Sequence, residues 1–183
     1  MSCLVQMMTD RYEVSFVRLA FGEVQKVDGI IAFGIFTSQE IDFLRSLSYA
    51  IVFVNSNQNN YEFDQVQIDF DQGQKQVVSY LLDQKRYTGL GYIGGIYNGQ
   101  NGSIGTHRLA AIKKILQERG QYDPRTFHVG EISRESGYCL AKKAVEEHTL
   151  AEAMLLGSDE VAEGVLDAFR ELGVRIPKDV AVI

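Results

Sequence analysis

Polar, charged and aromatic side chains recur in this sequence where a short apolar run ends. A carboxylate or a guanidinium can each bond two adjacent hydroxyls of a sugar, and aromatic faces can cover its apolar C–H patches. These residue types therefore predict a neutral, polyhydroxylated ligand. Asp, Asn and Ser also cap helices at such positions, so capping remains the alternative for each of them. The residues at these ends are 33–36, Asn55, Asp69 and Phe70, Arg108 after the 96–106 loop, Glu131 with Ile132, and Ser158 with Asp159.

The residues that could support catalysis are not arranged as in an enzyme. His107, His128 and His148 stand on separate predicted elements, without cysteine or acidic partners at the spacing of a zinc site. Ser133 lies in no nucleophile motif. Cys139 lies inside a predicted helix and is expected to be a buried structural thiol. We therefore predict no catalytic residue, no metal and no cofactor.

The glycine pattern GLGYIGG at residues 89–95 contains G-x-G-x-x-G without the context of a dinucleotide site. Such a site needs a strand before the first glycine and a helix that opens at the last. Here the preceding segment has helical periodicity, and the glycines fall inside a predicted strand. We assign no dinucleotide to this segment.

Short apolar runs alternate along the chain with longer amphipathic segments, and these elements must position the polar residues. Runs of about four to eight residues rich in β-branched or aromatic side chains are typical of buried strands. They occur at 12–19, 28–35, 50–55, 64–70, 89–95, 126–131, 151–158 and 180–183. Helical periodicity occurs at 37–47, 72–86, 103–119, 133–147 and 160–172. This alternation predicts an α/β fold with parallel sheets covered by helices.

Composition narrows the classes of function. The chain has 183 residues, 45% of them hydrophobic and 23% charged, which is ordinary globular usage and excludes disorder. A net charge of −6 without a block of Lys and Arg argues against a nucleic-acid-binding surface of its own. No apolar run approaches the roughly 20 residues of a membrane helix. The first ten residues do not resemble a signal peptide, so we expect a cytoplasmic protein.

Eight segments, in their order and spacing, resemble the effector-binding core of the LacI/GalR family of transcriptional regulators. They are DGIIAFG (28–34), AIVFVNSN (50–57), DQVQIDFDQG (64–73), YIGG (92–95), THRLAAIKKILQERG (106–120), GEISRESGY (130–138), LLGSDEVAEGVLDAFRELG (155–173) and IPKDVAVI (176–183). Within the family, these segments most resemble those of the galactoside-responsive members. The resemblance implies a periplasmic-binding-protein-like fold, in which two Rossmann-like lobes with parallel sheets, each a three-layer αβα unit, close on a small ligand that is usually a sugar.

The resemblance also implies roles for single residues. Arg108, within THRLAA, matches the arginine that hydrogen-bonds sugar hydroxyls. Asn55 stands where many members have an aspartate, and Ser158 stands where an asparagine is common, followed by the usual acidic residue, Asp159. Ile132 occupies a place that is often aromatic and packs on the sugar ring. The segment that passes the cleft near the lobe crossover is matched by Ile68, Asp69 and Phe70.

The resemblance implies that the chain is a fragment. We expect part of the N-terminal lobe at residues 1–70 and part of the C-terminal lobe at 71–183, with a hinge in the polar, helix-free interval 54–72. Both lobes are expected to be incomplete, and the family's helix-turn-helix domain is expected to be missing. The opening MSCLVQMMTD is expected to supply at most the tail of a helix, not the first strand of a lobe.

The predicted function is that of a sugar-sensing repressor core and not an enzyme. A small carbohydrate, with galactosides as the nearest class, would bind between the lobes of a homodimer and change the operator-DNA affinity of the headpiece. No DNA or membrane partner is expected for the chain itself. The first alternative is a sugar-binding protein of a transport system, which shares the two-lobed architecture. A small α/β enzyme, the second, needs a nucleophile with a base or a metal cluster at the strand ends, and we find none.

Overall fold

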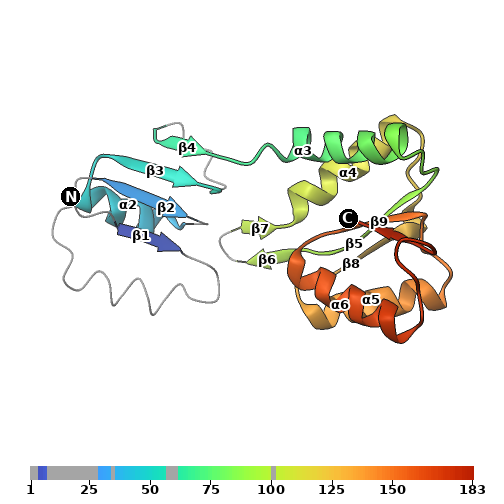
Figure 1. Cartoon of the computed structure of the whole chain (residues 1–183). Helices are drawn as coiled ribbons and strands as arrows, with labels where there is room; N and C mark the ends of the chain where they lie inside the picture. Colours follow the sequence, from blue (N-terminus) through green and yellow to red (C-terminus); the bar gives the residue numbers. More distant parts are fainter. Residues whose placement is uncertain (1–3, 8–28, 34–35, 57–61, 100–101) are drawn as a thin grey trace. The chain divides into compact units, whose positions relative to one another are not determined.

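The computed structural model describes residues 4–7, 29–33, 36–56, 62–99 and 102–183. The chain divides into two compact units, an N-terminal unit of Met1–Ile68 with Gly99–Gly102 and a C-terminal unit of Asp69–Asn98 with Ser103–Ile183. Each unit is built on its own parallel sheet (Figure 1). The prediction of an α/β fold with parallel sheets is confirmed. The assignment of these units to the two lobes of an effector core stays a prediction.

The N-terminal unit contains a four-stranded parallel sheet in the order β1-β2-β3-β4. Its described elements are β1 (Leu4–Met7), β2 (Ile30–Phe33), α2 (Ser38–Leu47), β3 (Ile51–Val54) and β4 (Asp64–Val66). Thr37 starts α2 with a capping box, in which its Oγ1 accepts from the Glu40 N–H and the Glu40 carboxylate accepts from the Thr37 N–H. Helix α2 buries its apolar face in one core cluster with β2 and β3.

Two expectations for this unit were wrong, and a third lies outside the described residues. Residues 4–7 form β1, paired in parallel with β2, so the first ten residues do not supply only a helix tail. The LVQM segment is short, but its apolar residues suit pairing within a parallel sheet. The strand expected at 64–70 ends at Val66, because the chain turns into a helix capped by Asp69. The strand expected at 12–19 lies outside the described residues.

The C-terminal unit contains a second four-stranded parallel sheet, in the order β10-β9-β5-β8. Its strands are β5 (Leu90–Gly95), β8 (Phe127–Gly130), β9 (Ala153–Leu156) and β10 (Ala181–Val182). Two short strands, β6 (Tyr97–Gly99) and β7 (Gly102–Ile104), form a separate two-stranded sheet.

Helices cover both faces of the sheet of the C-terminal unit, which gives three layers (Figure 1). Helix α3 (Phe70–Ser79), its π-helical continuation η1 (Tyr80–Gln84) and α4 (Thr106–Glu118) share one core cluster with the sheet. Helices α5 (Arg134–Glu146) and α6 (Asp159–Glu171) share the cluster on the other face. A single 3₁₀ turn, η2 (Pro124–Thr126), precedes β8. The helices begin within a few residues of the predicted positions.

Strand β5 lies between β9 and β8 and is buried along its whole length. Tyr92 belongs to the core cluster of α3 and α4, whereas its neighbour Ile93 belongs to the cluster of α5 and α6. The glycines of GLGYIGG lie in β5 or directly before it. Gly91 allows close packing, since a Cβ there would lie 2.8 Å from the carbonyl oxygen of Thr126.

One prediction about the surface of this unit was wrong. Cys139 in α5 is exposed, although a buried thiol was expected. The apolar positions of α5 that face its core are Gly137, Ala141 and Ala144, and residue 139 lies on the other side of the helix. Among the described residues, no helix is both long and apolar enough to cross a membrane.

Candidate functional site

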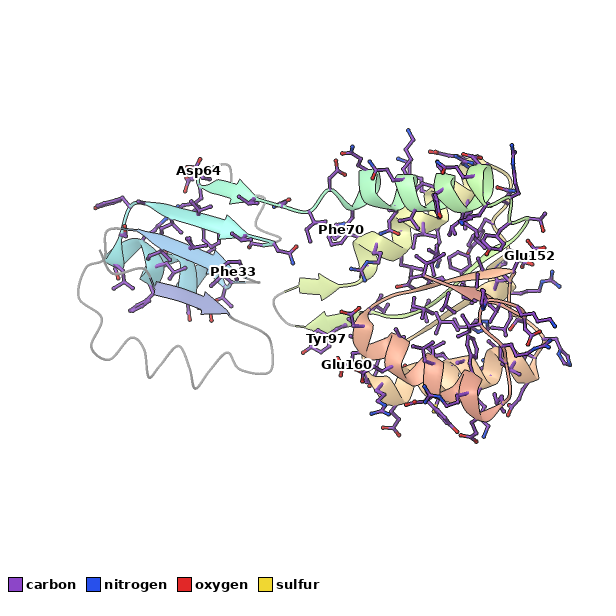
Figure 2. The ribbon with its side chains drawn as sticks, viewed as in Figure 1. Phe33, Asp64, Phe70, Tyr97, Glu152 and Glu160 are labelled. Carbon is purple, nitrogen blue, oxygen red and sulfur yellow. The ribbon has the colours of Figure 1, made fainter. Side chains whose placement is uncertain are left out.

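The C-terminal unit has a pocket of about 460 Å³ at the carboxyl ends of β9 and β10. Parallel α/β sheets bind ligands at this edge, where the strands end and the following helices begin. Figure 2 shows Phe70, at the start of α3, and Glu160, near the start of α6, at one end of this unit, and Glu152, which precedes β9, at the opposite end. The pocket is lined by Arg108, Leu156, Gly157, Ser158, Asp159, Ala162, Leu166, Val182 and Ile183.

The start of α4 fixes the position of Arg108. Gly105, just before the helix, has a φ of 84°, a left-handed conformation that glycine adopts without strain. A Cβ on Gly105 would lie 2.4 Å from the carbonyl oxygen of Gly95, so the chain packs directly on the end of β5. The next residue after Arg108, Leu109, is buried in the core. These contacts hold Arg108 at the carboxyl edge of the sheet.

Among the residues that the structure describes, the Arg108 guanidinium contacts an aromatic ring but no carboxylate. Its central carbon lies 5.5 Å from the centroid of the Phe70 ring, within the range of a cation–π contact. Of the arginines that the structure describes, only Arg86 and Arg108 form no ion pair. The paired ones are Arg45, Arg119, Arg125, Arg134, Arg170 and Arg175. Arg108 therefore keeps its fork of N–H donors for another partner.

Ser158 caps helix α6, Asp159 lies in its first turn, and both residues line the pocket. The backbone N–H of Val161 donates to the Ser158 Oγ at 3.4 Å, so Ser158 is the N-cap of α6. Asp159 is exposed in the first turn, where the helix dipole favours a carboxylate. The pocket thus combines guanidinium donors with carboxylate acceptors beside the apolar side chains of Leu156 and Leu166.

Asp69, Phe70 and Ile132 lie outside the set of lining residues. Asp69 is the N-cap of α3, because its Oδ1 accepts from the Gln72 N–H at 2.9 Å. Phe70 lies under Arg108 and supports it. Ile132 is half-buried between β8 and α5. Its backbone nitrogen is 2.4 Å from where a Cβ on Gly95 would stand, which places it at the same strand edge.

Asn55 and Ile68 belong to the N-terminal unit. Asn55 follows β3 with a φ of 52°, and its N–H donates to the Val66 carbonyl at 2.9 Å. Its side chain is exposed, and Ile68, after β4, is 59% exposed. The C-terminal unit by itself brings Arg108, Ser158 and Asp159 into one pocket. A role for Asn55 and Ile68 in the same site stays a prediction.

Sequence reasoning missed two residues at this edge. Gly157 lines the pocket, and a Cβ there would lie 2.8 Å from the Cα of Gly94. The order strand, glycine, capping serine in LLGSD is a signal for such a close backbone approach. Tyr92 packs beneath this edge with its hydroxyl against Gly157. The strand pattern marks Tyr92 only as a core residue and says nothing of where its hydroxyl ends.

His128 has a structural role within β8. It is buried, and burial lowers the pKa of its imidazole. Its Nε2 lies 3.1 Å from the Thr149 Oγ1, a contact that gives the ring a polar partner in the core. Within the described ranges, no three His, Cys, Asp or Glu side chains are grouped as a metal site requires.

In sequence, the chain is similar to a family of binding-protein domains and to bacterial transcriptional regulators. Residues 78–183 match the family model described as a periplasmic binding protein-like domain. The HTH-type transcriptional repressor MelR of Bacillus subtilis is 31% identical over 167 residues, covering 87% of this chain and 47% of MelR. The chain spans about half the length of the curated relatives it matches.

Solved structures show the same fold. The Escherichia coli transcriptional repressor ascG superposes with a TM-score of 0.69 and 22% identity, over 94% of this chain and 61% of that one. A LacI family transcriptional regulator from Lactobacillus casei, solved with bound sucrose, gives a TM-score of 0.66 and 22% identity, over 85% of this chain and 57% of that one.

Proposed function

Because the chain belongs to the family of periplasmic binding protein-like domains, among its LacI/GalR-type regulators, we propose that it is the ligand-sensing core of a sugar-responsive transcriptional repressor. It binds a small carbohydrate in the pocket around Arg108. The bound sucrose of the L. casei regulator supports this class of ligand. Galactosides are the class that we propose first, from the resemblance alone.

The proposal rests mainly on the contacts of the Arg108 guanidinium. A guanidinium that lies over an aromatic ring, has no carboxylate partner in the described part of the chain and lines a pocket can donate to two adjacent hydroxyls. Asp159 in the same pocket offers carboxylate oxygens as acceptors. A polyol needs both donors and acceptors, whereas an anionic ligand would be repelled by Asp159.

In the whole protein, the bound sugar acts on a DNA-binding domain. The sugar also contacts Asn55, Ile68 and Ile132, and it favours one relative orientation of two lobes in a cytoplasmic homodimer. A helix-turn-helix domain outside these 183 residues then changes its affinity for operator DNA. Such coupling between two sites is typically worth about 1–3 kcal/mol, which is about 5- to 150-fold in affinity.

Isothermal titration calorimetry of this chain against galactose, lactose, melibiose, glucose, sucrose and ribose tests the proposal. We expect at least one of these sugars to bind. Arg108→Lys keeps the charge but loses the planar fork, so we expect it to weaken that binding about tenfold or more.

Arg86→Lys is the matched control, because Arg86 is the other described arginine without an ion pair and lies outside the pocket. We expect it to change affinity less than about twofold, since it removes no pocket contact. Absence of binding to every sugar in the panel would overturn the proposed function. Equal losses of sugar affinity in Arg108→Lys and Arg86→Lys would show that the sugar does not bind at Arg108.

A further inference from the structure

The Tyr92 side chain is a core residue with a polar end. Tyr92 is 1% exposed and lies on the face of β5 that α3 and α4 cover. Its ring stacks on Phe127, with centroids 6.1 Å apart and an interplanar angle of 21°. The ring alone accounts for the packing, and phenylalanine would fill the same space.

The hydroxyl of Tyr92 points along β5 toward the carboxyl end of the sheet. It lies 2.2 Å from where a Cβ on Gly94 would stand and 2.6 Å from where one on Gly157 would stand. It therefore occupies volume that side chains at these two positions would take. Gly157 lines the pocket beside Arg108, so the hydroxyl lies directly behind a residue of the pocket wall.

This hydroxyl is buried and has no hydrogen-bond partner among the described residues. A buried polar group without a partner destabilises the folded state, because it has lost its bonds to water. Burial raises the pKa of Tyr92, with Arg108 opposing in part, so the phenol stays protonated near neutral pH and can both donate and accept. Tyr92 thus carries a polar group to which no described residue bonds.

We propose that the Tyr92 hydroxyl is a further specificity-determining group of the pocket, which exchanges a hydrogen bond with a sugar hydroxyl seated against Gly157 and Arg108. This inference rests on the proposed function, because it needs a polyhydroxylated ligand in that pocket. The bond forms only in the complex, so the hydroxyl discriminates between sugars that differ in one hydroxyl. A sugar that lacks the contacted hydroxyl gains no such bond and leaves the Tyr92 hydroxyl unpaired, so it binds more weakly than one that has it.

Calorimetry of the full chain with galactose and its monodeoxy analogues tests this role. We expect Tyr92→Phe to weaken galactose binding about tenfold, the usual effect of one lost hydrogen bond. One deoxygalactose, which lacks the contacted hydroxyl, should bind the wild type and Tyr92→Phe equally. Tyr122→Phe is the matched control, because Tyr122 packs edge-on against the same Phe127 ring, with centroids 5.0 Å apart, but it is the Tyr92 hydroxyl that lies against Gly94 and Gly157.

Thermal unfolding without sugar provides the second readout. Tyr92→Phe removes an unpaired hydroxyl, so its Tm should equal or exceed that of the wild type. A lower Tm than that of Tyr122→Phe would show that the hydroxyl already has a partner, and this would overturn the inference. Unchanged galactose affinity in Tyr92→Phe would also overturn it, with the proposed function intact. If the wild type binds no sugar, the proposed function fails and this inference fails with it.

Discussion

Two arginines, one in each unit, lie over a phenylalanine ring, and their other partners differ. In the N-terminal unit the guanidinium carbon of Arg45 is 4.9 Å from the centroid of Phe63. Arg45 also pairs with the carboxylates of Glu62 and Asp42. In the C-terminal unit Arg108 lies 5.5 Å from the centroid of Phe70 and has no carboxylate partner within the described part of the chain.

This difference separates a structural arginine from one available to a ligand. The carboxylates already use the donors of Arg45, and Phe63 in turn packs edge-on against the buried Phe53 at 5.1 Å. The Arg45 cluster therefore stabilises its own unit. Arg108 has the ring but keeps its donors, and it lines a pocket. The same cation–π contact thus serves folding in one unit and, in our proposal, recognition in the other.

The largest expected effects come from removing each ring in turn. Phe63→Ala should lower the free energy of unfolding by about 2 kcal/mol, less than for a fully buried phenylalanine because Phe63 is only half-buried. It should leave sugar affinity unchanged. Phe70→Ala should weaken sugar binding about fivefold to tenfold, because the guanidinium loses the face that orients it. Urea unfolding and calorimetry measure the two quantities on both variants.

The two arginine–ring pairs have different roles only if stability and sugar affinity respond separately to the two substitutions. A loss of sugar affinity in Phe63→Ala equal to that in Phe70→Ala would mean that both arginine–ring pairs serve the ligand. Unchanged affinity in Phe70→Ala would mean that Arg108 needs no support from the ring. Circular dichroism of both variants at the titration temperature checks that each remains folded.

Sequence periodicity predicts most of the helices and strands of the two units, because most of them bury an apolar face. It fails at Asp69 and Phe70, where the alternation of DQVQIDF suggests a strand through to the phenylalanine. In the structure the Asp69 carboxylate caps α3 and the strand stops at Val66. An aspartate can end a strand or begin a helix, and tertiary packing decides which.

A smaller effect is expected from neutralising a carboxylate near each arginine. Asp159→Asn removes charged acceptor oxygens from the pocket, and we expect it to weaken sugar binding about threefold to tenfold. Glu62→Gln removes one of the two carboxylate partners of Arg45. The pair is exposed, so its loss should cost less than about 1 kcal/mol of stability. Calorimetry and urea unfolding again separate the two. Weaker sugar binding in Glu62→Gln would contradict the assignment of Arg45 to folding alone.

The site is predictable from sequence only in part, for a physical reason. Arg108, Ser158 and Asp159 follow strands, and the carboxyl ends of parallel strands meet at one edge, so their convergence could be predicted. The position of the Tyr92 hydroxyl could not be predicted. Alternation shows on which face of the strand the ring lies, but it does not show toward which end of the strand the hydroxyl points. The sequence also could not decide whether Ser158 caps a helix or lines the pocket. In the structure it does both.

The smallest effect concerns another arginine, Arg175, which like Arg45 has a carboxylate partner. Its backbone N–H and Nε both donate to the Asp179 Oδ2, at 2.9 and 2.7 Å, and its hydrogen bonds lower the pKa of Asp179 from 3.8 to about 2. Because the unfolded chain binds this proton more readily, the pair stabilises the folded state above about pH 4, and this contribution is lost as the pH falls from about 4 to 2. We expect Asp179→Asn to lower the urea midpoint slightly at pH 6 and by less at pH 3, with sugar affinity unchanged. A midpoint difference that grows toward acid pH would contradict this direction. A change in sugar affinity would show that an arginine with a carboxylate partner can also affect ligand binding. That result would contradict the distinction drawn between Arg45, which stabilises the fold, and Arg108, which binds the sugar.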